Sequence, residues 1–158
     1  MRKLFLAAVF AAMAIPMAAV PASAQAPSAM GTWLTASGKA QVRIEACADP
    51  ASGALCGFIS GLIEPRGPDG VVVAPDAATD FRNENPALRS RKILGMPLIW
   101  GFKKTSDPNV YEGGKIYNGE NGKVYSANIS LQPDGTLRLR GYVGSPMFGE
   151  TQIWTRVK

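Results

Sequence analysis

Short apolar runs separated by turn-forming residues follow one another along most of this chain. The run at 40–47 (AQVRIEAC) is the clearest, because Val42, Ile44 and Ala46 alternate with polar or charged residues. A period of two indicates a β-strand with one buried face. The pattern predicts about eight strands, with no long amphipathic helix between them. They cover residues 31–36, 40–47, 55–64, 96–103, 109–117, 122–131, 136–144 and 151–157.

The links between these strands indicate how they are arranged. In the second half of the chain the links are of hairpin length, and those at 118–122 and 133–135 contain Asn-Gly or Asp-Gly. Such pairs are typical of tight antiparallel turns. We therefore expect an all-β fold, either an up-and-down barrel or a sandwich. A barrel of about eight strands is wide enough for its own side chains or for one small ligand.

The first residues of the chain predict export. A basic start precedes an apolar run from Leu4 to Val20, and an Ala-Ser-Ala motif ends at Ala24. Together these are typical of a signal peptide that is cleaved after that residue. An uncleaved anchor is the alternative, since ~20 apolar residues can span a bilayer. We expect a periplasmic or secreted protein that is not integral to the membrane. The expected segments are a signal peptide at 1–24, a flexible start at 25–30 and a single domain at 31–158.

Export would place Cys47 and Cys56 in an oxidising compartment, where a disulfide is the default expectation. The disulfide would clip the end of a hairpin formed by 40–47 and 55–64. A redox pair and a metal site are the alternatives. The spacing is too long for a Cys-x-x-Cys motif, however, and the chain contains no histidine.

Charge and composition give little support for catalysis. The net charge of +5 falls to +3 without Arg2 and Lys3, which is too mild to indicate a nucleic-acid partner. Without histidine the chain lacks the commonest general base and the usual zinc ligand. We therefore predict no catalytic residue, no metal and no cofactor. Catalysis by a pair of carboxylates stays open as an alternative, with Asp80 and Glu84 as the nearest candidates.

Residues 79–95 (TDFRNENPALRSRKILG) fit neither a clean strand nor a long helix. The Asn-Pro pair at 85–86 is a helix start and the final glycine is a stop, so we expect a short helix that caps the barrel. Its apolar side chains, Leu88, Ile93 and Leu94, would face inward. The alternative is a lid whose arginines grip an anionic headgroup or a carboxylate. The candidate ligand contacts in this segment are Asp80, Asn83, Arg89 and Arg91.

The stretch at 112–125 (EGGKIYNGENGKVY) combines glycines with lysine, as phosphate-binding loops do. It lacks the spacing of such a loop and the helix that follows one, so a tight hairpin explains it better. Its two tyrosines are candidates for the lining of a cavity, with structural packing as the alternative. The aromatic candidates for such a lining are Trp100, Tyr117 and Tyr125.

The two ends of the predicted domain resemble lipocalin and calycin barrels. Gly31-Thr32-Trp33 matches the Gly-x-Trp that opens their first strand, and Arg156 lies on the last predicted strand. The resemblance implies that this arginine packs over Trp33 and closes the base of the barrel. A guanidinium over an indole contributes about 0.5–2 kcal/mol. Both residues are therefore expected to be structural.

Further motifs run in order through the chain. They are Gly31-Thr32-Trp33, Cys47 with Cys56-Gly57, Asp80-x-x-Asn83, Leu88-Arg89-x-Arg91, Gly95, the stretches 113–117, 121–125 and 137–142, Gly149 and Trp154-x-Arg156. In this order they resemble the DUF2147 family, small exported bacterial proteins of uncharacterised function. The resemblance covers nearly the whole chain after the signal peptide. It implies a lipocalin-like barrel and a periplasmic home, and it implies no established activity.

Three functional hypotheses follow from these observations. The first is non-catalytic binding of a small amphipathic or hydrophobic molecule inside the barrel. The second is an envelope protein–protein interaction module whose barrel is filled by side chains, and the third is the carboxylate-based enzyme. The state of the barrel interior separates the first two, because a carrier needs a cavity of several hundred Å³.

Overall fold

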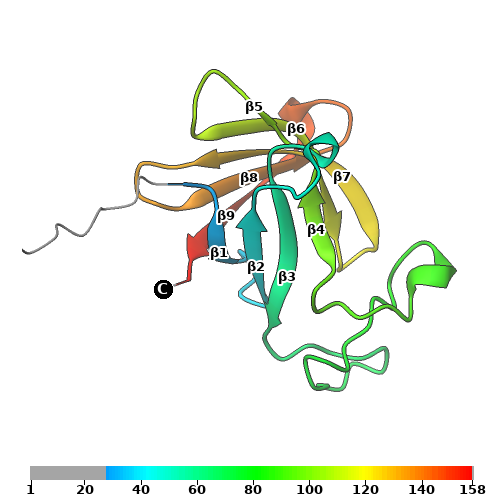
Figure 1. Ribbon diagram of the computed structural model, residues 1–158. Coiled ribbons are helices and arrows are strands. Elements are labelled where there is room, and N and C mark those ends of the chain that lie inside the picture. The colour runs from blue at the N-terminus through cyan, green and yellow to red at the C-terminus, as the bar shows by residue number, and fades with distance from the viewer. Residues whose placement is uncertain (1–27, 158) are drawn as a thin grey trace, which may run out of the picture.

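The computed structural model of this chain describes residues 28–157, which form a single antiparallel sheet that closes into an eight-stranded barrel (Figure 1). The all-β, up-and-down barrel is therefore confirmed. The predicted signal peptide and residues 25–27 lie outside the described residues. The strands are β1 (Gly31–Leu34), β2 (Ala40–Glu45), β3 (Cys56–Leu62), β4 (Pro97–Trp100), β5 (Lys103–Lys104), β6 (Val110–Asn118), β7 (Lys123–Leu131), β8 (Leu137–Tyr142) and β9 (Glu150–Arg156).

Each strand of the barrel pairs with its neighbours in the chain. β1 and β9 pair through Trp33 opposite Arg156, and β4 pairs with β6, so the sheet closes on itself. The two residues of β5 pair only with the start of β6. The predicted strand 96–103 is thus wrong in its extent. The chain turns at Gly101, where φ is 78°, and this left-handed conformation splits the run into β4 and β5.

The inward positions of the strands are filled by large apolar side chains. Trp33, Val42 and Ile59 lie opposite one another on β1, β2 and β3, which is the cross-strand packing that stabilises a sheet. At Gly114 a Cβ atom would collide with the Phe102 ring, so this glycine makes room for an aromatic ring. The least exposed large apolar side chains among the described residues are Trp33, Val42, Ile44, Leu55, Ile99, Phe102, Ile129, Leu137, Leu139 and Trp154, each at 0–1 %.

The base of the barrel has the contact that the lipocalin resemblance implies. The Arg156 guanidinium lies 4.2 Å from the centre of the Trp33 ring. It also donates to the carbonyl oxygens of Met30, at 2.9 Å, and of Ser28. The Trp33 indole donates to the Ala29 carbonyl over 2.8 Å. These bonds fasten the residues before β1 across the end of the barrel.

The disulfide between Cys47 and Cys56 is confirmed, with Cα atoms 4.9 Å apart. It joins the end of β2 to the start of β3. The loop between them includes one of three short 3-10 turns, each of which begins with a proline after an Asn, Asp or Ser cap. These turns are η1 (Pro50–Ser52), η2 (Pro86–Leu88) and η3 (Pro146–Phe148). None of the helices within residues 28–157 is long and apolar enough to cross a membrane.

The predicted capping helix is a single turn, η2, within the long green connection from β3 to β4 (Figure 1). The helix does not extend beyond this turn, because the chain returns in an extended pairing. Asp80 N donates to Arg91 O over 3.0 Å, and Ile93 N donates to Ala78 O over 3.1 Å. The inward orientation predicted for Leu88 and Leu94 is wrong, since they are 38 % and 37 % exposed. Only Ile93 of the predicted three packs against the core.

Candidate functional site

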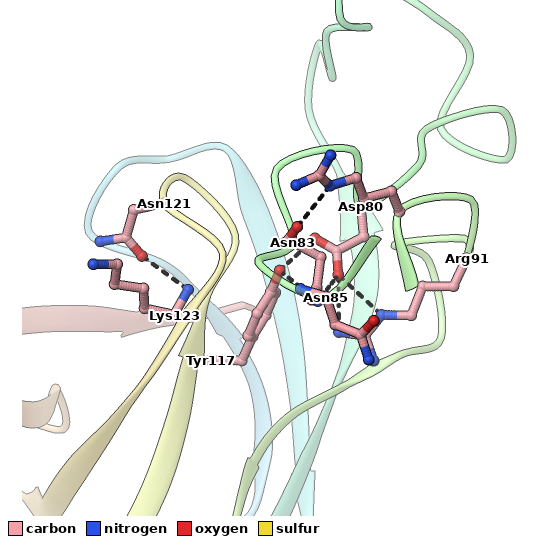
Figure 2. Close-up of polar contacts among 8 residues, drawn as sticks. Asp80, Asn83, Asn85, Arg91, Tyr117, Asn121 and Lys123 are labelled. Atoms are coloured by element: carbon pink, nitrogen blue, oxygen red, sulfur yellow. Dashed lines mark hydrogen bonds and ion pairs between the residues drawn. The ribbon is translucent and has the colours of Figure 1, made fainter. Parts of the chain in front are cut away.

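A buried carboxylate, Asp80, lies at the centre of the polar cluster in the 79–95 segment. Its side chain is 1 % exposed. The Tyr117 hydroxyl donates to its Oδ1 over 2.5 Å, and Asn83 Nδ2 donates to its Oδ2 over 2.8 Å. Arg91 adds Nε and Nη2, each 2.9 Å from the same Oδ2 (Figure 2). The carboxylate is therefore compensated by one cation and by two neutral donors, as a buried charge requires.

The backbone of the 79–95 segment brings these groups together. Asn83 N donates to Asp80 O over 2.9 Å, which makes a tight turn. The pairing of Thr79 with Lys92 then holds Arg91 beside Asp80. The Asn83 side chain accepts from Asn85 N over 2.9 Å, so its amide faces the carboxylate in a fixed orientation. An Asx turn of this kind explains why asparagine occupies position 83.

Tyr117 reaches the cluster from β6. Ile116 points into the barrel, so the next side chain points outward, yet Tyr117 is only 4 % exposed because the 79–95 segment covers it. Arg91 lies 5.2 Å from the centre of its ring. Burial raises the pKa of Tyr117 to about 12, helped by its hydrogen bond to the negative Asp80. At neutral pH the phenol therefore keeps its proton and donates it to the carboxylate.

The hydrogen bonds of the cluster are made within the protein. Tyr117 also accepts from Asn83 Nδ2 over 3.1 Å, and Arg89 Nε donates to Asn83 O over 2.8 Å. Among residues 28–157, every buried side-chain nitrogen or oxygen has a hydrogen-bond partner. A closed network of this kind fastens one segment to another, as expected for buried polar groups that are fully paired.

The turn between β6 and β7 contacts the same segment. A Cβ atom at Gly122 would collide with the Arg82 carbonyl, so the two backbones touch. Lys123 Nζ lies 3.5 Å from Glu84 Oε1, and its backbone N donates to Asn121 Oδ1 over 3.1 Å (Figure 2). The glycine is therefore needed both for its φ of 74° and for this close approach.

The structure assembles some of the candidate residues and separates others. Asp80, Asn83, Arg91 and Tyr117 meet, with Arg89 at the edge of the cluster. Trp100 and Tyr125 take no part in this cluster among the hydrogen bonds of the described residues.

Trp100 and Tyr125 lie on opposite faces of the sheet. Trp100 lies opposite Lys115 on the outward face and is half-buried. Tyr125 lies opposite the inward Ile116, and its hydroxyl accepts from Asn121 over 2.8 Å. These residues and Tyr117 therefore do not line one common cavity.

The two carboxylates considered as a catalytic pair also diverge. Asp80 is buried against Arg91, whereas the Glu84 side chain is 63 % exposed and faces Lys123. Within residues 28–157 no group of three Cys, Asp or Glu side chains is arranged to hold a metal ion.

Two of the hollows formed by residues 28–157 lie on the outside of the barrel. One, of ≈ 320 Å³, runs along the outward side chains of β2 and β3 to the end of the 79–95 segment. Its lining residues are Arg43, Glu45, Phe58, Ile59, Ser60, Leu94 and Gly95. The other, of ≈ 640 Å³, lies between β5 and η3. Its lining residues are Lys103, Lys104, Thr105, Glu112, Gly113, Asn128, Tyr142 and Pro146.

The second hollow and the loop beside it were missed by reasoning from the sequence. The signal was present, because Ser145-Pro146 is a turn start and Met147-Phe148 places two large apolar residues inside that turn. An apolar pair in a turn departs from the usual polar composition of loops. The structure leaves both side chains exposed, Met147 at 81 % and Phe148 at 83 %.

Comparison with protein families gives a match over residues 31–156, from the start of β1 to the end of β9. The chain belongs to the DUF2147 family. This family is described as uncharacterised proteins conserved in bacteria, so membership assigns no activity. The motifs noted in the sequence all lie within the matched residues.

The fold of this DUF2147 protein is similar to a solved structure from Helicobacter pylori, a protein described as belonging to the lipocalin family. The two share 23 % sequence identity with a TM-score of 0.63, and the match covers 82 % of each chain. At that identity the likeness concerns the fold alone. Comparison with curated proteins found no match.

Proposed function

We propose that this DUF2147 protein is an exported, non-catalytic interaction module whose barrel is filled and whose outer surface makes its contacts. The observation that carries the proposal is the packing of the barrel. Trp33, Phe102 and Trp154 occupy the interior and are 0–1 % exposed. Ligand sites in proteins are commonly clefts or cavities of about 300–1,000 Å³, and the two hollows described above lie outside the barrel instead.

Export is supported by two independent features. The first 24 residues have the pattern of a cleaved signal peptide. The Cys47–Cys56 disulfide is of the kind that persists in oxidising compartments. We therefore expect the protein in the periplasm or outside the cell.

A non-catalytic role is supported by the chemistry of the Asp80 cluster. The carboxylate is 1 % exposed and is held by Arg91 and Tyr117. A general base has to reach the proton that it removes, and this carboxylate is covered. The cluster instead explains how the 79–95 segment is held against β6.

Native mass spectrometry of the protein purified from the periplasm tests the proposal. We expect a mass that begins at Gln25, contains one disulfide and carries no bound molecule. A stoichiometric small molecule retained by the protein would contradict the filled-barrel proposal. Full-length protein in the cytoplasm would contradict export.

Binding of a small amphipathic molecule is the second candidate, and the ≈ 320 Å³ hollow favours it. Phe58 and Leu94 form the apolar side of this hollow. Arg43 and Glu45 form its charged side, with Arg43 Nε 3.1 Å from Glu45 Oε2. Ser60→Trp would fill the hollow, and Ser126→Trp on the outward face of β7 is its control. A co-purified mass that only Ser60→Trp removes would locate the ligand here. A mass retained by both variants would exclude this hollow.

A further inference from the structure

The loop between β8 and β9, residues 143–149, presents large apolar side chains to solvent. Val143 is 72 % exposed, Met147 81 % and Phe148 83 %, the three highest values for large apolar residues within 28–157. All three belong to the loop 143–149, and Met147 and Phe148 are consecutive in it. Contiguous exposed apolar groups of this kind commonly mark a contact surface.

The loop is held in an ordered conformation. Arg140 Nε donates to Pro146 O over 2.5 Å, and its Nη2 donates to Met147 O over 3.2 Å. Phe148 N donates to Ser145 O over 3.1 Å within η3. The charged side chain of β8 therefore binds the carbonyl groups of the loop while Met147 and Phe148 point away. Such preorganisation lowers the entropic cost of contact with a partner.

A basic surface lies next to this loop. Lys103 and Lys104 of β5 line the ≈ 640 Å³ hollow together with Pro146 of η3, and Figure 1 shows β5 and η3 beside each other. Further basic residues occupy outward positions of β6 and β8. The charged side chains of this face and of the adjacent β5–β6 link are Lys103, Lys104, Lys115, Arg138 and Arg140, against Asp107, Glu112 and Glu150.

We infer that this face attaches the protein reversibly to an anionic lipid bilayer. Met147 and Phe148 enter the interface between headgroups and acyl chains, while Lys103 and Lys104 face the anionic headgroups. An apolar tip beside a basic patch supplies the two signals that peripheral attachment requires. The inference rests on the proposed outer-surface function and names its partner.

The size of the apolar patch favours a bilayer over a protein partner. A stable protein interface covers about 800 Å² on each side, and the three exposed side chains of the 143–149 loop are far smaller than that. A lipid surface needs only a few inserted side chains, because the surrounding lysines add electrostatic attraction. The net positive charge of this face is complementary to anionic headgroups.

Vesicle co-sedimentation of the purified, full-length processed protein tests the inference. We expect binding to vesicles of phosphatidylglycerol and phosphatidylcholine, weak binding to phosphatidylcholine alone, and a decline as salt rises. Met147→Ser with Phe148→Ser should weaken binding about tenfold or more. The matched control is Val71→Ser with Val72→Ser, a second exposed pair in the β3–β4 connection, and it should bind as the unchanged protein does.

The charge contribution is tested separately. Lys103→Gln with Lys104→Gln should abolish most of the preference for phosphatidylglycerol, about tenfold. Lys39→Gln with Lys92→Gln removes the same charge from exposed positions elsewhere and should change binding little. Equal losses in both double variants would show a non-specific charge effect and would overturn the site.

A fluorescent reporter distinguishes insertion from simple adhesion. Phe148→Trp should show a blue-shifted emission with phosphatidylglycerol vesicles and quenching by lipids brominated on their acyl chains. Absence of sedimentation and of a shift for otherwise folded protein would overturn the inference. If native mass spectrometry still finds an empty barrel in that case, the outer-surface proposal stands and the bilayer is the wrong partner. Retention of a stoichiometric small molecule would instead contradict the proposed function itself.

Discussion

Tyr117 donates a hydrogen bond to Asp80 over 2.5 Å, although 37 residues separate them in the chain. The bond joins β6 to the 79–95 segment, which the β6–β7 turn also contacts through Gly122 and Lys123. It also explains why an outward-facing tyrosine is buried. The position of the segment therefore depends on this contact, and its removal has measurable consequences.

Tyr117→Phe should lower the free energy of unfolding by about 1.5–3 kcal/mol, because the buried Asp80 carboxylate loses a donor. The control is Tyr125→Phe, which removes a hydroxyl bonded only to the exposed Asn121. That change should stay within about 0.5 kcal/mol. Urea unfolding followed by circular dichroism measures both. Equal effects of the two substitutions would contradict the role given to Tyr117.

Alkaline pH should weaken the fold through the same residue. The pKa of Tyr117 is raised from 10.0 to about 12 by burial and by Asp80. Between these pH values the unfolded chain loses the phenolic proton while the folded chain keeps it. The unfolded state then binds fewer protons, so stability falls as pH rises. The stabilisation is complete below pH 10 and is lost as pH passes about 12.

To isolate this effect, the melting temperatures of the unchanged protein and of Tyr117→Phe are measured as the pH rises above 10. The difference between them should shrink across the window, because only the unchanged protein carries the titrating phenol. A constant difference would show that Tyr117 does not titrate with folding.

Arg91→Ala should destabilise the protein by about 1.5–3 kcal/mol, since it removes charged hydrogen bonds to a buried carboxylate. Arg89→Ala is a close control in the same segment. Its guanidinium donates to the backbone oxygen of Asn83 and to no carboxylate among the hydrogen bonds of the described residues, so a loss of about 0.5–1.5 kcal/mol is expected. Thermal unfolding of the two variants measures both losses of stability. A larger loss at Arg89 would show that the Asp80 charge is compensated elsewhere.

Gly122→Ala should separate the 79–95 segment from the β6–β7 turn, because the new Cβ meets the Arg82 carbonyl. Gly135→Ala is a matched control with a similar φ, 81° against 74°, and with nothing within 4 Å of the added atom. Both substitutions cost about 1–2 kcal/mol for the left-handed backbone.

Limited proteolysis measures the difference between the two glycine variants. Gly122→Ala should be cleaved faster within 79–95, whereas Gly135→Ala should keep the cleavage pattern of the unchanged protein. Identical patterns would show that the segment is held without this close approach.

The positions of the barrel strands could be predicted because they depend on local patterns. Alternation at 40–47 predicts β2, and the turns at 118–122 and 133–135 predict the hairpins around β7. The division of the run 96–103 into β4 and β5 was not predictable in this way. A glycine in a strand is common in barrels, and only the paired neighbours decide whether the chain turns there.

The conformation of the 79–95 segment could be predicted only in part from its local sequence. Its cap was correctly expected at 85–86, since Asn85 accepts from Ala87 N in η2. The length of the helix was overestimated, because the chain beyond Leu88 pairs with residues 78–80 instead of continuing to turn. That competition depends on the burial of Asp80, which a local pattern does not contain.

The sequence by itself determined most of the strands, the hairpin turns and the disulfide partners, because each depends on the periodicity or chemistry of nearby residues. The contact of Arg156 with Trp33 was implied by the lipocalin resemblance. Only the tertiary structure decided which large apolar side chains are buried inside the barrel, that Tyr117 meets Asp80, and that the 143–149 loop lies beside Lys103. These relationships join residues far apart in the chain. They arise from the closure of the sheet, which sets the neighbours of every outward side chain at once.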